Sequence, residues 1–105
     1  MNENELNKLI DEEISNFTWA KQVDTDCFVR HRIQPRPIKL ALDTDGKILV
    51  ECMLVTDHNG KDDSPYRVAY DPEHGQFVRE VTLKNGVFHY IGRFPSLEDL
   101  VDEFA

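Results

Sequence analysis

The chain has 105 residues, a length that fits a single domain. Apolar residues make up 40% and charged residues 30%, which argues against a disordered chain, and no run approaches the roughly 20 apolar residues of a membrane span. The net charge of −8 disfavours binding to nucleic-acid phosphate or anionic lipid. It fits either a partner with a basic surface or acids that only keep a small domain in solution.

The N-terminal residues and the two cysteines bear on the compartment. Residues 1–5 are acidic, whereas a secretory leader would be basic and then apolar. Cys27 and Cys52 both lie in apolar surroundings, which predicts two buried, reduced thiols and no disulfide. We therefore expect a cytoplasmic protein.

The first predicted element is a helix over residues 3–17. Its apolar positions recur with the three- and four-residue spacing that lines one side of a helix: Leu6, Leu9, Ile10, Ile14 and Phe17. Residues 18–26 are predicted to form a connection, with Trp19 and Val23 as anchors back to the core.

Strand patterns follow through most of the chain. Six segments alternate or are continuously apolar, over residues 27–33, 38–42, 47–56, 66–70, 77–83 and 87–91. Short connections predict antiparallel neighbours, and the segment 47–56, apolar on both faces, is expected in the middle of the sheet. Pro35 and Pro37 indicate a kink or an edge strand.

Turn residues separate these strands and a capping signal ends the sheet region. Asp45-Gly46 and Asn85-Gly86 are strong hairpin signals, and residues 58–65 form the longest polar loop. Ser96, followed by Asp99 and the apolar residues of 97–104, starts a short amphipathic helix. The predicted fold is a single α+β domain over residues 1–105: an N-terminal helix, a five- to six-stranded, mostly antiparallel sheet and a short C-terminal helix, with both helices on one face.

No spacing predicts a catalytic residue, a metal site or a cofactor. Asp43 and Asp45 resemble the start of a calcium loop, but the later ligands are missing and a hairpin turn explains them. The four histidines are scattered singly, unlike zinc ligands. Glu51 interrupts an apolar strand, and we expect it on the solvated face opposite a cross-strand lysine or arginine.

A basic segment stands out from the acidic background. If residues 27–33 form a strand, then Phe28, Arg30 and Arg32 lie on one face, with Arg36 just beyond. Guanidinium groups beside an aromatic ring could bind an anion or a partner. The alternative is that these arginines pair with acids of the same chain, such as those of residues 11–13.

The same segment carries a resemblance to a known family. Cys27-Phe-Val-Arg30 is similar to the arginine-bearing strand of SH2 domains, and residues 94–104 resemble the closing helix of that family. The resemblance implies that Arg30 would bind phosphotyrosine. Trp19 lies only eleven residues before Arg30, which leaves no room for the helix that SH2 domains have there, so we assign no family.

Three classes of function are consistent with these patterns. The first hypothesis is a small acidic interaction module, such as an inhibitor, immunity protein or antitoxin, that binds a basic partner surface as a monomer or weak dimer. The second is a ligand- or anion-binding domain that uses the face of Phe28, Arg30 and Arg32. The third is a small enzyme of unknown reaction.

Overall fold

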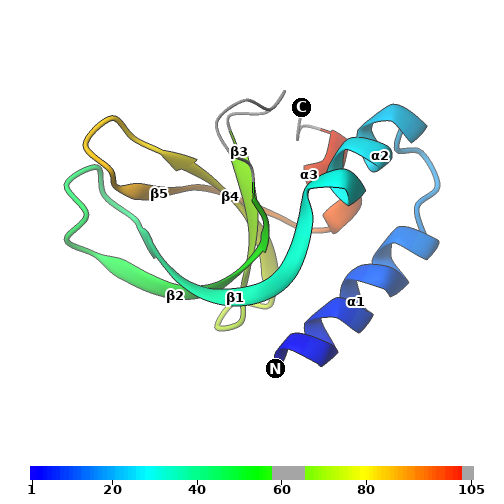
Figure 1. Ribbon diagram of the computed structural model, residues 1–105, viewed down its shortest axis with the longest axis horizontal. Helices are drawn as coiled ribbons and strands as arrows, with labels where there is room; N and C mark the ends of the chain where they lie inside the picture. The colour runs from blue at the N-terminus through cyan, green and yellow to red at the C-terminus, as the bar shows by residue number, and fades with distance from the viewer. Residues whose placement is uncertain (58–65, 103–105) are drawn as a thin grey trace.

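The computed structural model describes residues 1–57 and 66–102 (Figure 1). In chain order the elements are α1 (Glu3–Ser15), α2 (Gln22–His31), β1 (Arg32–Ala41), β2 (Leu49–Thr56), β3 (Tyr66–Asp71), β4 (Gln76–Thr82), β5 (Phe88–Phe94) and α3 (Leu97–Asp102). The predicted α+β class is confirmed, with an N-terminal helix, a five-stranded sheet and a short C-terminal helix.

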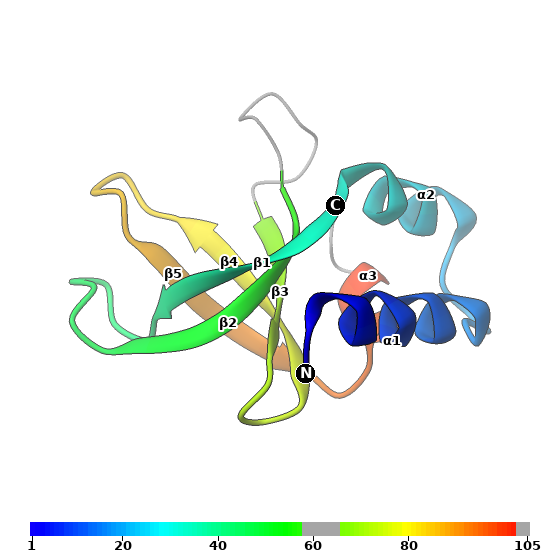
Figure 2. The same ribbon diagram turned by 60° about the horizontal axis from the view of Figure 1, so that its bottom comes forward.

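The five strands follow one another in space in the order of the chain and curl into a small closed barrel. Neighbours along the chain are antiparallel, and β2 lies inside the sheet between β1 and β3, as predicted. The barrel closes where β1 meets β5 in parallel, through the single pair Ala41 and His89. In both views the two hairpins β1–β2 and β4–β5 extend together at the end opposite the helices (Figures 1 and 2).

The predicted strand over residues 27–33 is wrong, because most of it belongs to helix α2. Cys27, Phe28 and His31 are buried while Val29 and Arg30 are exposed, which is a helical and not an alternating pattern. Asp24 in the first turn and Arg30 and His31 in the last turn are favourably placed for the helix dipole. The described part of the chain therefore has five strands and three helices instead of the expected six and two.

Strand β1 runs through the proline segment with an irregularity. Its register against β2 shifts between Arg32 and Arg36, around Pro35, and is regular from Pro37 to Ala41. Strand β1 pairs with β5 only at Ala41. Along the proline segment, the edge of β1 that faces away from β2 therefore has no strand partner among the described residues. The predicted kink is confirmed as the register shift around Pro35, and the predicted edge position as the unpaired edge of β1 beside the prolines.

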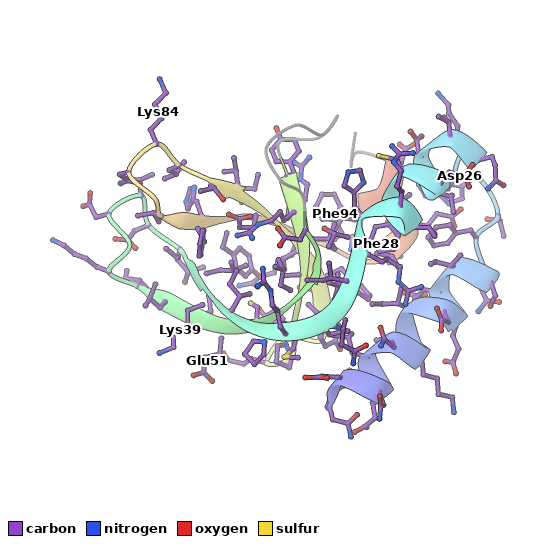
Figure 3. The ribbon with its side chains drawn as sticks, viewed as in Figure 1. Asp26, Phe28, Lys39, Glu51, Lys84 and Phe94 are labelled. Carbon is purple, nitrogen blue, oxygen red and sulfur yellow. The ribbon has the colours of Figure 1, made fainter. Side chains whose placement is uncertain are left out.

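Two apolar clusters lie on the two faces of the curved sheet. The larger one joins the sheet to the helices and includes Leu6, Ile10, Phe28, Val55, Val68, Tyr70, Phe77, Leu97, Leu100 and Val101. Figure 3 shows Phe28 and Phe94 at this junction of helices and sheet. The second cluster fills the inside of the barrel with Leu40, Cys52, Ala69, Val78 and Tyr90. Both helix α1 and helix α3 contribute to the first cluster, as the sequence predicted.

Local signals at turns and helix starts are confirmed. Gly46 and Gly86 have φ angles of 75° and 86°, the left-handed conformation that glycine adopts without strain. The hydroxyl of Ser96 accepts a hydrogen bond from the backbone N–H of Asp99 and donates one to its carboxylate, which starts α3. Helix α1 begins with a complete capping box between Asn2 and Glu5.

Candidate protein-binding surface

The structure separates the residues that were predicted to share a basic strand face. Phe28 is fully buried in the helix–sheet core, so its ring is not available to a ligand. Arg30 is exposed on helix α2, whereas Arg32 and Arg36 belong to β1. The common face of Phe28, Arg30 and Arg32 does not exist, because residues 27–31 follow a helical and not a two-residue period.

Two of these arginines form ion pairs within the chain. Nη1 of Arg32 donates to Oδ1 of Asp11 over 2.7 Å, which joins β1 to α1. Nη2 of Arg36 donates to Oδ2 of Asp57 over 2.9 Å. The pairing of Arg32 with the acids of residues 11–13 was one of the two predicted alternatives, and it is confirmed.

Glu51 occupies the position that was expected. It is exposed on β2 directly opposite Lys39 of β1, and both side chains project away from the sheet (Figure 3). Over residues 1–57 and 66–102, no group of three or more His, Cys, Asp or Glu side chains is placed to hold a metal ion.

A buried ion pair crosses strands β3 and β4. Nε of Arg67 donates to Oε2 of the fully buried Glu80 over 2.7 Å, and Nη1 reaches Oδ1 of Asp57 at 3.3 Å. The hydroxyl of Thr82 donates to the second oxygen of Glu80, and the guanidinium lies 4.8 Å from the ring centroid of Phe88. Both carboxylate oxygens of Glu80 therefore have hydrogen-bond partners inside the protein. Glu80 stabilises the fold and is not accessible to a substrate as a general acid or base.

A second polar chain starts at the buried carboxylate of Asp71. Its Oδ2 lies 2.8 Å from Nδ1 of His74 and accepts a hydrogen bond from the hydroxyl of Tyr90 over 3.1 Å; that hydroxyl in turn accepts one from Nε of Arg93. Burial alone would raise the pKa of Asp71, but the hydrogen bonds from His74 and Tyr90 outweigh it and lower the pKa.

An aspartate beside a histidine also occurs in nucleophilic enzymes, where the pair activates a nearby hydroxyl or thiol group. Cys52 is buried inside the barrel, and burial together with the charge of Asp71 raises the pKa of its thiol to about 12. A thiol with that pKa is protonated near neutral pH and is a poor nucleophile. Asp71 and His74 therefore orient the β3–β4 turn without an activated nucleophile at Cys52.

A cleft of about 470 Å³ opens beside strands β1 and β2, and the buried Cys52 is among its lining residues. Its lining includes Pro37, Lys39, Glu51, Met53 and Pro72. Lys39 and Glu51 are the charged residues among its described lining, and both are exposed. Binding sites for small molecules usually combine burial with convergent polar groups, and this cleft has neither.

The most unusual surface feature is Trp19, which lies between helices α1 and α2. Its side chain is 52% exposed, and Val23 at the start of α2 is 69% exposed. The prediction that both residues anchor the connection to the core is therefore wrong. An exposed tryptophan leaves a large apolar area in contact with water, which is unfavourable. Tryptophan is enriched at the centre of protein interfaces, where that area becomes buried.

The backbone around Trp19 is fixed by Glu98 of helix α3. Oε2 of Glu98 accepts hydrogen bonds from the backbone N–H groups of Thr18, Trp19 and Ala20, with distances of 2.8, 2.8 and 2.7 Å. Burial alone would raise the pKa of Glu98, but the three N–H donors lower it below its ordinary value. The carboxylate thus holds the connection in one shape while the indole stays in solvent.

Acidic residues surround Trp19 along the chain. Residues 11–26 contain five acids, Asp11, Glu12, Glu13, Asp24 and Asp26, against the single base Lys21. Glu12 and Glu13 occupy the last turn of α1, where the helix dipole disfavours negative charge by about 0.3–1 kcal/mol for each residue, and no base lies in that turn. Local stability therefore does not explain Glu12 and Glu13, whereas Asp11 pairs with Arg32 and Asp24 is favourably placed in the first turn of α2. We call Trp19, Val23 and these five acids the helical surface (Asp26 is labelled in Figure 3).

Sequence reasoning missed this surface because the decisive contact is nonlocal. Glu98 is 78 to 80 residues from the N–H groups that it binds. The available signal was an isolated tryptophan among polar and acidic residues, with no apolar neighbour at helical spacing except Val23.

Comparisons with known proteins add no assignment. None of the helices in the described ranges is both long and apolar enough to cross a membrane. No known protein family, curated protein or solved structure matches the chain.

Proposed function

We propose that this protein is a small interaction module that binds a basic surface of a partner protein through its helical surface. The exposed side chain of Trp19, on a backbone that is held by the Glu98 carboxylate, is the observation that carries the proposal. Because the backbone at Trp19 is already fixed, binding has only the two side-chain torsions of the tryptophan left to order, so more of its contact energy remains as affinity.

The charge around Trp19 specifies the chemistry of the partner. Five acids and one base within residues 11–26 give this segment a net charge of −4, which attracts lysine and arginine side chains. A cation of the partner placed over the indole would add a cation–π contact of about 0.5–2 kcal/mol. We infer that the module acts by covering a basic site, as an inhibitor, immunity protein or antitoxin does.

A cytoplasmic location is part of the same proposal. Cys27 and Cys52 are both free, and buried free thiols are usual in proteins that function in a reducing compartment. The alternative of an anion-binding face has lost its support, because Phe28 is buried and Arg32 and Arg36 pair with Asp11 and Asp57.

Trp19 is the only tryptophan of the chain, so its fluorescence reports directly on this surface. Partners captured from a lysate of the source organism would be titrated against the protein while tryptophan emission and quenching by iodide are recorded. Binding through the helical surface should shift the emission to the blue and protect the indole from iodide.

Two variants and salt test the assignment. Trp19→Ala should weaken binding, measured by calorimetry, by about 2 kcal/mol or more, roughly thirtyfold in Kd. The matched control Ile48→Ala, an exposed apolar residue on the far hairpin, should bind like wild type. Affinity should fall steeply toward about 1 M salt, where the screening length is about 3 Å. Equal binding of Trp19→Ala and wild type, or affinity indifferent to salt, would refute the proposal.

A further inference from the structure

The end of the barrel opposite the helices exposes a second group of apolar side chains. Leu42, Ile48 and Leu49 of the β1–β2 hairpin and Phe88 of the β4–β5 hairpin are 40–59% exposed. We call residues 42–49 and 83–88 the hairpin end. Four large exposed apolar side chains on two adjoining hairpins are more than the scattered single residues that a monomer surface normally shows.

The two hairpins are joined, so this surface is preformed. Nδ2 of Asn85 donates to the backbone oxygen of Thr44 over 3.1 Å. Val87 packs so close to Gly46 that a Cβ atom there would lie 3.0 Å from its Cγ2. Oδ1 of Asp43 accepts hydrogen bonds from the backbone N–H groups of Lys47 and Ile48, which fixes the first turn.

The charge of the hairpin end differs from that of the rest of the molecule. It contains two acids, Asp43 and Asp45, and two bases, Lys47 and Lys84, so its net charge is zero. Figure 3 shows Lys84 projecting from the tip of its hairpin. The chain as a whole carries −8, so all of its net charge lies outside this end.

We propose that the hairpin end is a self-association surface, on which a second copy of this chain docks through two-fold symmetry. In such an interface the same patch faces itself, so it must be self-complementary. Here apolar side chains meet apolar side chains, and each copy offers both lysines and aspartates to the other. A strongly basic partner would instead be drawn to the acidic helical surface, and two acidic copies repel least where the net charge is zero.

Sedimentation velocity from low micromolar to near-millimolar protein tests the proposal. Wild type should show a concentration-dependent dimer. The double variant Ile48→Thr with Leu49→Thr should raise the dimer Kd at least tenfold. Both side chains are exposed, so thermal melts should confirm that the variant folds normally. The matched control Val23→Thr, at a residue that is still more exposed but lies on α2, should dimerise like wild type.

Three results would overturn this inference. The first is a monomeric wild type at every concentration, and the second is a dimer that the double variant leaves unchanged. The third is a dimer that Val23→Thr weakens as much as the double variant does. Partner capture lost in the double variant while wild type stays monomeric would assign the hairpin end to a different protein and would equally refute self-association.

Discussion

Replacing Glu80 by Gln removes one charge from the buried ion pair between Arg67 and Glu80. Glu80 is fully buried and bonds Nε of Arg67 over 2.7 Å. The glutamine keeps the size of the side chain but leaves the guanidinium with Asp57 at 3.3 Å as its remaining carboxylate partner. Asp57 is already shared with Arg36, so it compensates Arg67 only in part.

The expected loss of stability is large for a chain of this size. Breaking a buried ion pair by removing one partner costs about 3–5 kcal/mol, because the remaining charge stays desolvated. A domain of this length has a total unfolding free energy of roughly 5–15 kcal/mol. The substitution should therefore remove at least about a fifth of the stability.

Urea unfolding followed by circular dichroism measures this loss. With a slope of about 2 kcal/mol per molar urea, the midpoint should fall by about 2 M. Glu51→Gln, an exposed control on β2, should change the unfolding free energy by no more than about 0.5 kcal/mol. The double variant Arg67→Met with Glu80→Leu should recover most of the stability, because no buried charge is left unpaired. A loss below about 1 kcal/mol for Glu80→Gln would refute the reasoning.

Three further predictions concern titration, reactivity and capping. Folding lowers the pKa values of Asp71 and Glu98, so the two ionised carboxylates stabilise the folded protein above their unfolded pKa of about 4, and this stabilisation is lost as the pH falls through the folded pKa values. The urea midpoint of the wild type should therefore drop below about pH 4. In Glu98→Gln, which lacks one of the two carboxylates, the drop should be less steep. Burial raises the pKa of Cys52 to about 12, so this thiol should resist iodoacetamide at about pH 8 in the folded protein and react with it in urea. Peptide mass mapping would show which thiols are labelled, and rapid labelling of Cys52 in the folded protein would contradict its placement inside the barrel. Ser96→Ala should cost about 1 kcal/mol in urea unfolding, since the N–H of Asp99 loses its acceptor; an unchanged midpoint would mean that packing alone sets the start of α3.

Much of the fold was predictable because its signals are local. The spacing of Leu6 and Ile10 identified α1, and the Asn85-Gly86 pair identified the β4–β5 hairpin, since each depends on residues a few positions apart. Helix α2 was mistaken for a strand because this segment fits both periods. Residues 27, 29, 31 and 33 alternate along the chain with 28, 30 and 32, as in a strand, while residues 27, 28 and 31 form the buried face of a helix. A segment of ten residues is too short for periodicity alone to decide between them.

The candidate site was less predictable because it depends on contacts between distant residues. The pairing of Arg32 with acids of α1 could be anticipated from the charge imbalance of the sequence. The exposure of Trp19 could not, because a large aromatic residue is usually buried, and the position of its backbone depends on a hydrogen bond to Glu98, which is 79 residues away in the chain.

The single closing pair between β1 and β5 has a consequence for the order in which the chain folds. Strands adjacent in sequence are also adjacent in space, so the meander forms through short loops before any long one must close. In the described part of the chain, Ala41 and His89 form the one strand pair that joins the two ends of that meander, beside the hydrogen bond from Asn85 to Thr44 and the packing of Val87 at Gly46. Formation of this joint is then the last step of barrel assembly, and changes at Ala41 or His89 should speed unfolding while leaving the folding rate nearly unaltered.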